Sequence, residues 1–164
     1  MKYSIAAELI KKYTEARNNL KKHIDSNTAR QVSAELGEWI IKEMYDGIKA
    51  NSKTQRGWDI ELKNKKRIQV KTHSKHKTNT KNRWTYVNYE PEAPIDLLII
   101  LVFSDELFIE EFYEISWQDA QKFISSKEKK SKLHIKWDDL HEYKKDLSSL
   151  PKEIQILSVF NNKK

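Results

Sequence analysis

Apolar and polar positions alternate along residues 57–71 in a pattern that predicts a β-hairpin. The alternating apolar residues are Trp58, Ile60, Leu62, Ile68 and Val70. A period of two over runs of this length is typical of strands, and the polar stretch 63–66 between the two runs is rich in Asn and Lys, as turns are. We therefore expect two strands joined by a tight turn.

Two amphipathic helices are predicted before this hairpin, over residues 3–24 and 28–48, because apolar residues recur there at three- and four-residue steps. The stripe of the first helix consists of Ile5, Leu9, Tyr13, Ala16, Leu20 and Ile24. The buried side of the second is expected to consist of Val32, Leu36, Trp39, Ile40, Met44 and Ile48. We expect the first stripe to pack into the core, with a dimer contact as the alternative.

Further strands are predicted after the hairpin, at residues 84–89, 95–103, 107–115 and 132–137. The continuous apolar run 95–103 is typical of a central strand covered on both faces. Ser116 and Asp119 resemble a capping box that begins a short helix ending near Ile124. The pattern as a whole predicts an α/β fold, with a mixed central sheet of about five strands flanked by helices.

Length and composition limit the possible functions. A chain of 164 residues is expected to form a single domain, residues 1–164. The absence of cysteine excludes disulfides, thiolate metal sites and cysteine catalysis. With only three glycines, no glycine-rich phosphate loop can form. No apolar run has the length of a signal peptide or a membrane helix, so we expect a cytoplasmic protein without a membrane partner.

The net charge of +7 and the pI near 9.3 favour a polyanionic partner. Residues 72–83 contain no apolar side chain, and four of the twelve are Lys or Arg. Long polar segments of compact domains are often functional, so we interpret this one as a loop that enters a nucleic-acid groove. The candidate nucleic-acid contacts are Arg56, His73, Ser74, Lys75, His76, Lys77, Asn79, Lys81 and Arg83.

The hairpin also carries candidate catalytic residues. Asp59 lies on its first strand, while Gln69 and Lys71 lie two residues apart on the second and therefore share a face. The Asp59 carboxylate, the Gln69 amide oxygen and the Val70 carbonyl are oxygen ligands of the kind that suit Mg²⁺. Lys71 could stabilise negative charge on a phosphate. The alternative interpretation is an ordinary hairpin with a polar outer face.

The order Asp59, turn, Gln69-Val70-Lys71 resembles the signature of the PD-(D/E)XK nuclease superfamily, in the QxK variant that has glutamine in place of the second acid. The segment 33–38 resembles the glutamate-bearing first helix of that superfamily. Two residues depart from the pattern: Trp58 replaces the proline, and Gln69 removes one metal-binding charge. The resemblance spans about residues 27–112.

This resemblance implies a restriction-endonuclease-like core at about residues 27–115. It also implies that Asp59, Gln69 and the Val70 carbonyl bind Mg²⁺, and that Lys71 assists the attacking water or the transition state. Glu35 or Glu38 would restore the missing charge. The helical periodicity favours Glu35 and the resemblance favours Glu38, so both stay candidates.

The function implied by the resemblance is Mg²⁺-dependent hydrolysis of double-stranded DNA by a small type II restriction endonuclease. Cutting both strands of a palindrome calls for a homodimer. One alternative, favoured by Gln69, is a nucleic-acid-binding module of the same fold without catalytic activity. Another is a structure-specific repair or junction nuclease.

Overall fold

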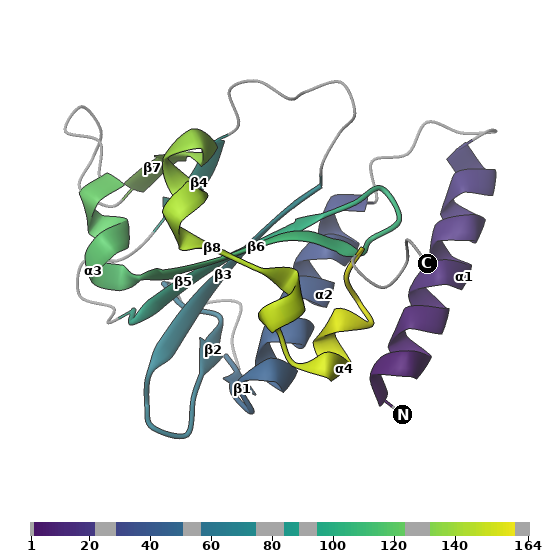
Figure 1. Cartoon of the computed structure of the whole chain (residues 1–164), viewed down its shortest axis with the longest axis horizontal. Helices are drawn as coiled ribbons and strands as arrows, with labels where there is room; N and C mark the ends of the chain where they lie inside the picture. Colours follow the sequence, from purple (N-terminus) through teal and green to yellow (C-terminus); the bar gives the residue numbers. More distant parts are fainter. Residues whose placement is uncertain are drawn as a thin grey trace.

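The computed structural model of the chain describes residues 2–21, 29–50, 57–74, 84–88, 95–123 and 132–159. It confirms an α/β architecture with a mixed central sheet, which has six strands in the order β1-β2-β3-β5-β6-β8 (Figure 1). These strands are β1 (Ile48–Lys49), β2 (Ile60–Glu61), β3 (Arg67–Ser74), β5 (Leu97–Phe103), β6 (Ile109–Ser116) and β8 (Lys144–Lys145). A separate two-stranded sheet consists of β4 (Trp84–Asn88) and β7 (Lys132–Lys136).

Helices lie on the sheet and at its margin (Figure 1). They are α1 (Lys2–Lys21), α2 (Ala29–Met44), α3 (Trp117–Ala120) and α4 (Lys152–Gln155), with 3₁₀ turns at Gln121–Phe123, Trp137–Tyr143 and Leu147–Ser149. The Ser116 hydroxyl accepts a hydrogen bond from the Asp119 N–H at 3.1 Å, which confirms the predicted cap of α3. No helix within the described ranges combines the length and the hydropathy needed to cross a membrane.

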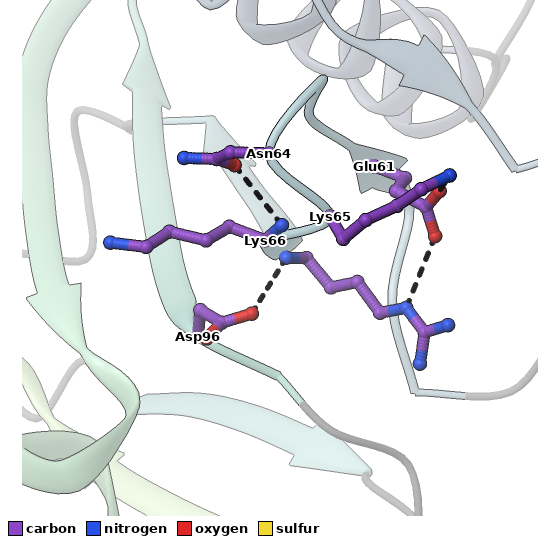
Figure 2. Close-up of polar contacts among 6 residues, drawn as sticks. Glu61, Asn64, Lys65, Lys66 and Asp96 are labelled. Carbon is purple, nitrogen blue, oxygen red and sulfur yellow. Dashed lines mark hydrogen bonds and ion pairs between the residues drawn. The ribbon is translucent and has the colours of Figure 1, made fainter.

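The predicted hairpin is confirmed, because β2 pairs antiparallel with β3 through Ile60 opposite Ile68. In its turn, the Asn64 side-chain oxygen accepts a hydrogen bond from the Lys66 N–H at 3.1 Å, and Lys65 pairs with Glu61 (Figure 2). These local bonds hold the turn in shape and so fix the register of the two strands.

Asp96 connects this hairpin to the central strand. Its carboxylate accepts a hydrogen bond from the Arg67 N–H at 2.8 Å, and Figure 2 shows it beside the hairpin turn. The Asp96 N–H in turn donates to the Arg67 carbonyl. Asp96 is therefore a strand-entry residue that aligns the beginnings of β3 and β5, which run parallel.

Strand β5 divides the hydrophobic core into two clusters, one on each face of the sheet. Ile99, Leu101 and Phe103 pack with residues of α2 and α4 on one face. The intervening residues Leu98, Ile100 and Val102 pack on the other face with residues of β4, β7 and the 3₁₀ turn Trp137–Tyr143. The prediction of a central strand covered on both faces is confirmed.

The pairing of two predicted strands differs from the expectation of a single sheet. Strands β4 and β7 pair with each other, with Tyr86 opposite His134, and form a ribbon apart from the central sheet. A strand's own sequence does not specify its partner, because pairing depends on residues far away in the chain.

The second helix is shorter than predicted. It ends at Met44, and the Gly47 N–H donates to the Lys42 carbonyl. Ile48 then belongs to β1 and is 67% exposed, instead of lying on the buried side of the helix.

The predicted buried stripe of α1 is only partly correct. Tyr13 packs against the core, but Ile5 and Leu9 are more than half exposed, and Thr14 and Arg17 are buried instead. The Thr14 hydroxyl and the Arg17 guanidinium donate to backbone carbonyls in the turn between β5 and β6, at Glu106 and Asp105. These polar contacts turn a different side of the helix toward the body of the protein.

Candidate active site

The candidate site lies where β2 separates from β3. The Asp59 N–H makes the last backbone hydrogen bond to β3, at 2.9 Å from the Ile68 carbonyl, and the Asp59 carboxylate then takes the place of the next backbone acceptor. Its Oδ2 accepts hydrogen bonds from the Val70 N–H at 2.7 Å and from Gln69 Nε2 at 2.5 Å. The structure therefore brings Asp59, Gln69 and Val70 together, as the sequence predicted.

The polar atoms of this group form an oxygen-rich cluster. Gln69 is 5% exposed, and its Nε2 also lies 3.4 Å from the Val70 carbonyl oxygen, so this nitrogen donates to two oxygens at once. The two ends of an amide are nearly equal in size, so half a turn of the Gln69 amide places its oxygen beside the other two. A carboxylate, a carbonyl and an amide oxygen are ligands that suit Mg²⁺.

The cluster of Asp59, Gln69 and Val70 contains one carboxylate, which is little negative charge for binding a divalent cation. Among the described residues, no group of three or more His, Cys, Asp or Glu side chains could hold a metal ion. Mg²⁺ commonly binds through one or two carboxylates and completes its shell with water and substrate phosphates. The residues present fit such a partial shell, in which Asp59 provides the carboxylate.

Of the two candidate glutamates, Glu38 of α2 is the one whose charge acts on Asp59. The Glu38 carboxylate lies 2.5 Å from Lys49 Nζ, and its negative charge contributes to raising the pKa of Asp59. Glu35 is exposed, and its charge acts on Lys49. The prediction that one helix glutamate accompanies Asp59 thus points to Glu38 on electrostatic grounds.

Lys49 is a charged neighbour of the site that the sequence did not single out. Its hydrogen bond to Glu38 raises its pKa, and the charges of Glu35 and Asp59 act in the same direction. The residue lies in β1, a strand of two residues within a stretch predicted as helix end and polar connector. The one available signal was Gly47, which marks the end of the helix just before it.

Burial raises the pKa of the Asp59 carboxyl, against the opposing effects of the Val70 N–H and of the Lys71 charge. A carboxyl that keeps its proton more readily than usual, next to a specific cation, is a common feature of functional sites. Lys71 is half-buried and follows Gln69 by two positions on β3, so the two residues share a face.

His73 comes next on the same face, and its side chain makes internal contacts. Its Nε2 lies 2.8 Å from the Thr85 hydroxyl, and its ring meets the Trp137 ring edge-on with centroids 4.9 Å apart. Burial lowers its pKa to about 4, so the ring is neutral at pH 7. In this arrangement His73 joins β3 to β4 and does not present a cation to a phosphate.

The other predicted nucleic-acid contacts are mostly beyond the described residues. The prediction of a loop over residues 72–83 is wrong for residues 72–74, which belong to β3, and Ser74 is half-buried at the end of that strand. The contacts that lie outside the described ranges are Arg56, Lys75, His76, Lys77, Asn79, Lys81 and Arg83.

The chain matches no protein-family model, and no curated protein is similar enough to count as a relative.

Proposed function

We propose that this protein is a Mg²⁺-dependent DNA endonuclease with a restriction-endonuclease-like core, and that it acts as a small type II restriction endonuclease. The observation that carries the proposal is the meeting of Asp59, Gln69 and the Val70 backbone on neighbouring strands, with Lys71 on the same face as Gln69. Cation ligands and a lysine in this arrangement suit phosphodiester hydrolysis.

Each residue has a separate role in the proposal. Asp59, the Val70 carbonyl and the Gln69 amide oxygen hold Mg²⁺, which when bound polarises the phosphate and lowers the pKa of a water molecule. Glu38 adds a second carboxylate when it exchanges its contact with Lys49. The Lys71 ammonium stabilises the negative charge that develops on the phosphate.

The proposal includes a homodimer on double-stranded DNA, because cutting both strands requires two sites. The net charge of +7 on each chain supports binding to a polyanion. The exposed side chains of Ile5 and Leu9 support a contact between copies, since they border an apolar groove of about 370 Å³ together with Trp39.

A second candidate is a nucleic-acid-binding module of the same fold without catalytic activity. Two observations favour it: Gln69 stands where the superfamily has an acid, and its Nε2 donates a hydrogen bond to the Asp59 carboxylate, the only carboxylate in the cluster of Asp59, Gln69 and Val70. In this reading the hydrogen bonds of Asp59 to Gln69 and Val70 serve to end the β2–β3 ladder.

Digestion of plasmid DNA with Mg²⁺ or with EDTA, followed by sequencing of the ends, tests the proposal. We expect the wild type to cut only with Mg²⁺ and Asp59→Ala not to cut. Lys71→Met should lower the cleavage rate by about 100-fold or more, since removing one group that stabilises the transition state has an effect of that size. Lys66→Met on the same hairpin is the matched control, because this lysine is exposed.

The outcomes separate the candidates. DNA binding without cleavage in either Mg²⁺ or Mn²⁺ would establish the binding module. Preferential cutting of branched over linear DNA, at no fixed sequence, would indicate a structure-specific nuclease. Full activity of Lys71→Met would remove Lys71 from the mechanism.

A further inference from the structure

The ribbon formed by β4 and β7 has one buried face and one exposed face. Thr85, Val87 and Ile135 are fully buried against the central sheet. The intervening residues Tyr86 and Asn88 are exposed, and Tyr86 is 58% exposed. A large aromatic ring on the outer face is not explained by packing of the core.

The Tyr86 ring is nevertheless held in place. It lies opposite His134 in the register, and the two ring centroids are 4.2 Å apart at an interplanar angle of 39°. His134 therefore covers part of the Tyr86 ring, while more than half of the Tyr86 surface stays open to solvent. An aromatic ring ordered in this way can stack on a flat ligand at a small cost in conformational entropy.

The outer face of the ribbon also carries a cation. Lys136 follows His134 by two residues on β7, so the two side chains share a face. The ion pair of Lys136 with Asp138 is solvent-exposed and therefore weak. This cation favours a ligand that carries phosphate groups.

The ribbon is also joined to the strand of the candidate site. The Thr85 hydroxyl contacts His73 Nε2 at 2.8 Å and accepts a hydrogen bond from Trp137 Nε1 at 2.9 Å. His73 follows Lys71 by two residues on β3. The inner face of the ribbon is thus fixed to the strand that carries Gln69 and Lys71.

We infer that the outer face of the β4–β7 ribbon binds unpaired nucleotides of a DNA strand, with a base stacked on Tyr86 and the backbone phosphates near Lys136. Aromatic side chains with neighbouring cations are the usual combination for single strands, because every base has a free face only when it is unpaired. A base inside a duplex is already stacked on both sides. This inference rests on the nucleic-acid part of the proposed function.

The test is binding of a fluorescent single-stranded oligonucleotide, and of the duplex with the same sequence, measured by anisotropy in EDTA. We expect Tyr86→Ala to weaken single-strand binding by about 5-fold to 100-fold, since stacking on one aromatic ring contributes about 1–3 kcal/mol. Tyr86→Phe should keep the wild-type affinity. Ile48→Ala is the matched control, because Ile48 is also an exposed apolar residue (67%) and lies in β1, away from the ribbon (Figure 1).

A second variant tests the phosphate contact. Lys136→Met should reduce the slope of log affinity against log salt by about 0.7 for single-stranded DNA. Unchanged single-strand affinity of Tyr86→Ala, in a variant whose circular dichroism and melting temperature match the wild type, would overturn the inference. Equal weakening of single-strand and duplex binding would also overturn it, because stacking on an unpaired base would then not be the cause.

Failure of the inference and failure of the proposed function are distinguishable, because binding in EDTA requires no hydrolysis. A wild type that cuts DNA while Tyr86→Ala binds single strands normally removes the ribbon site and leaves the nuclease. If the wild type does not cut DNA and Tyr86→Ala weakens single-strand binding, the ribbon site stands and the protein is a non-catalytic binding module.

Discussion

The two faces of β3 differ in character: one is apolar and packs into the core, and the other is polar and carries the candidate site. Ile68 and Val70 belong to the core cluster beneath α2, and Thr72 lies under Gly37 of that helix. The alternate residues Gln69, Lys71 and His73 carry polar groups on the other face. Side chains alternate across a strand, so the run from Ile68 to His73 supplies both a packing surface and a candidate site.

The comparison teaches that the polar face depends on the apolar one for its geometry. A site that must hold its groups within a fraction of an ångström needs a rigid support. Here the apolar residues of β3 are fixed between α2 and β5, and this packing also fixes the backbone that carries the polar residues. Substitutions on the two faces should therefore differ in the size, sign and pH dependence of their effect on the free energy of unfolding.

The largest effect on stability is expected from His73 on the polar face, and it should depend on pH. The pKa of this ring is about 4 in the folded protein and about 6.5 when unfolded. The unfolded state therefore binds more protons between these values, and stability that is present above pH 6.5 is lost as the pH falls to 4. The loss should amount to about 3 kcal/mol.

His73→Gln should lack this pH-dependent part of the unfolding free energy, measured by urea denaturation at several pH values. His141→Gln is the control, because His141 is exposed. If the unfolding free energies of the wild type and of His73→Gln change with pH in parallel, His73 is not held neutral in the folded protein. The polar face would then not be distinguished from the apolar face by a pH-dependent contribution to stability.

A smaller effect is expected on the apolar face, from Gly37→Ala. A methyl group at this position would lie 2.3 Å from the Thr72 side chain, so helix or strand must shift. Overpacking of this kind costs about 1–3 kcal/mol, and the better helix propensity of alanine returns about 1 kcal/mol. We expect a net loss of up to about 2 kcal/mol in the free energy of unfolding, measured by urea denaturation.

The double variant Gly37→Ala with Thr72→Ser provides the control, because serine lacks the methyl group that would collide. It should recover the lost stability. If the double variant is as unstable as Gly37→Ala alone, the close approach of α2 to β3 is not the cause.

The smallest effect, and one of opposite sign, is expected for Asp59→Asn. Burial raises the pKa of Asp59, so ionising it in the folded state is unfavourable. This cost is absent below the unfolded pKa, grows as the pH rises from the unfolded to the folded pKa, and is fully present above the folded pKa. Asparagine keeps an oxygen for the Val70 N–H and removes the charge, so Asp59→Asn should melt slightly above the wild type at pH 7.

The difference between the Asp59→Asn and wild-type melting temperatures should vanish near pH 3. Cleavage activity, under the proposed function, should be lost in the same variant. A variant that is less stable than the wild type at pH 7 would indicate that the carboxylate mainly serves the hydrogen bonds to Gln69 and Val70.

Local patterns were sufficient to predict the elements whose contacts lie nearby in the chain. The hairpin, the buried run of β5 and the Ser116 cap follow from alternation, from continuous hydrophobicity and from a side chain that bonds three residues away. The meeting of Asp59 with Gln69 follows from the hairpin, since its two strands are separated by one short turn.

Features that depend on distant residues could not be predicted. Arg17 is buried because its guanidinium meets the Asp105 carbonyl, 88 positions further along the chain. The pairing of β4 with β7 depends on strands more than 40 residues apart. The position of Lys49 beside the candidate site could not be predicted, because its partner Glu38 lies on a helix that meets the sheet only in the folded protein.

The parallel pairing of β3 with β5 has a consequence for how such a protein can evolve. The chain leaving Ser74 must return to the opposite end of the sheet before it enters β5 at Leu97, and β4 lies on that return. The alignment of β3 and β5 is set by their own pairing and by the hydrogen bond between Arg67 and Asp96. A lineage can thus change the length or sequence of the crossing while it keeps the strand that carries the candidate site.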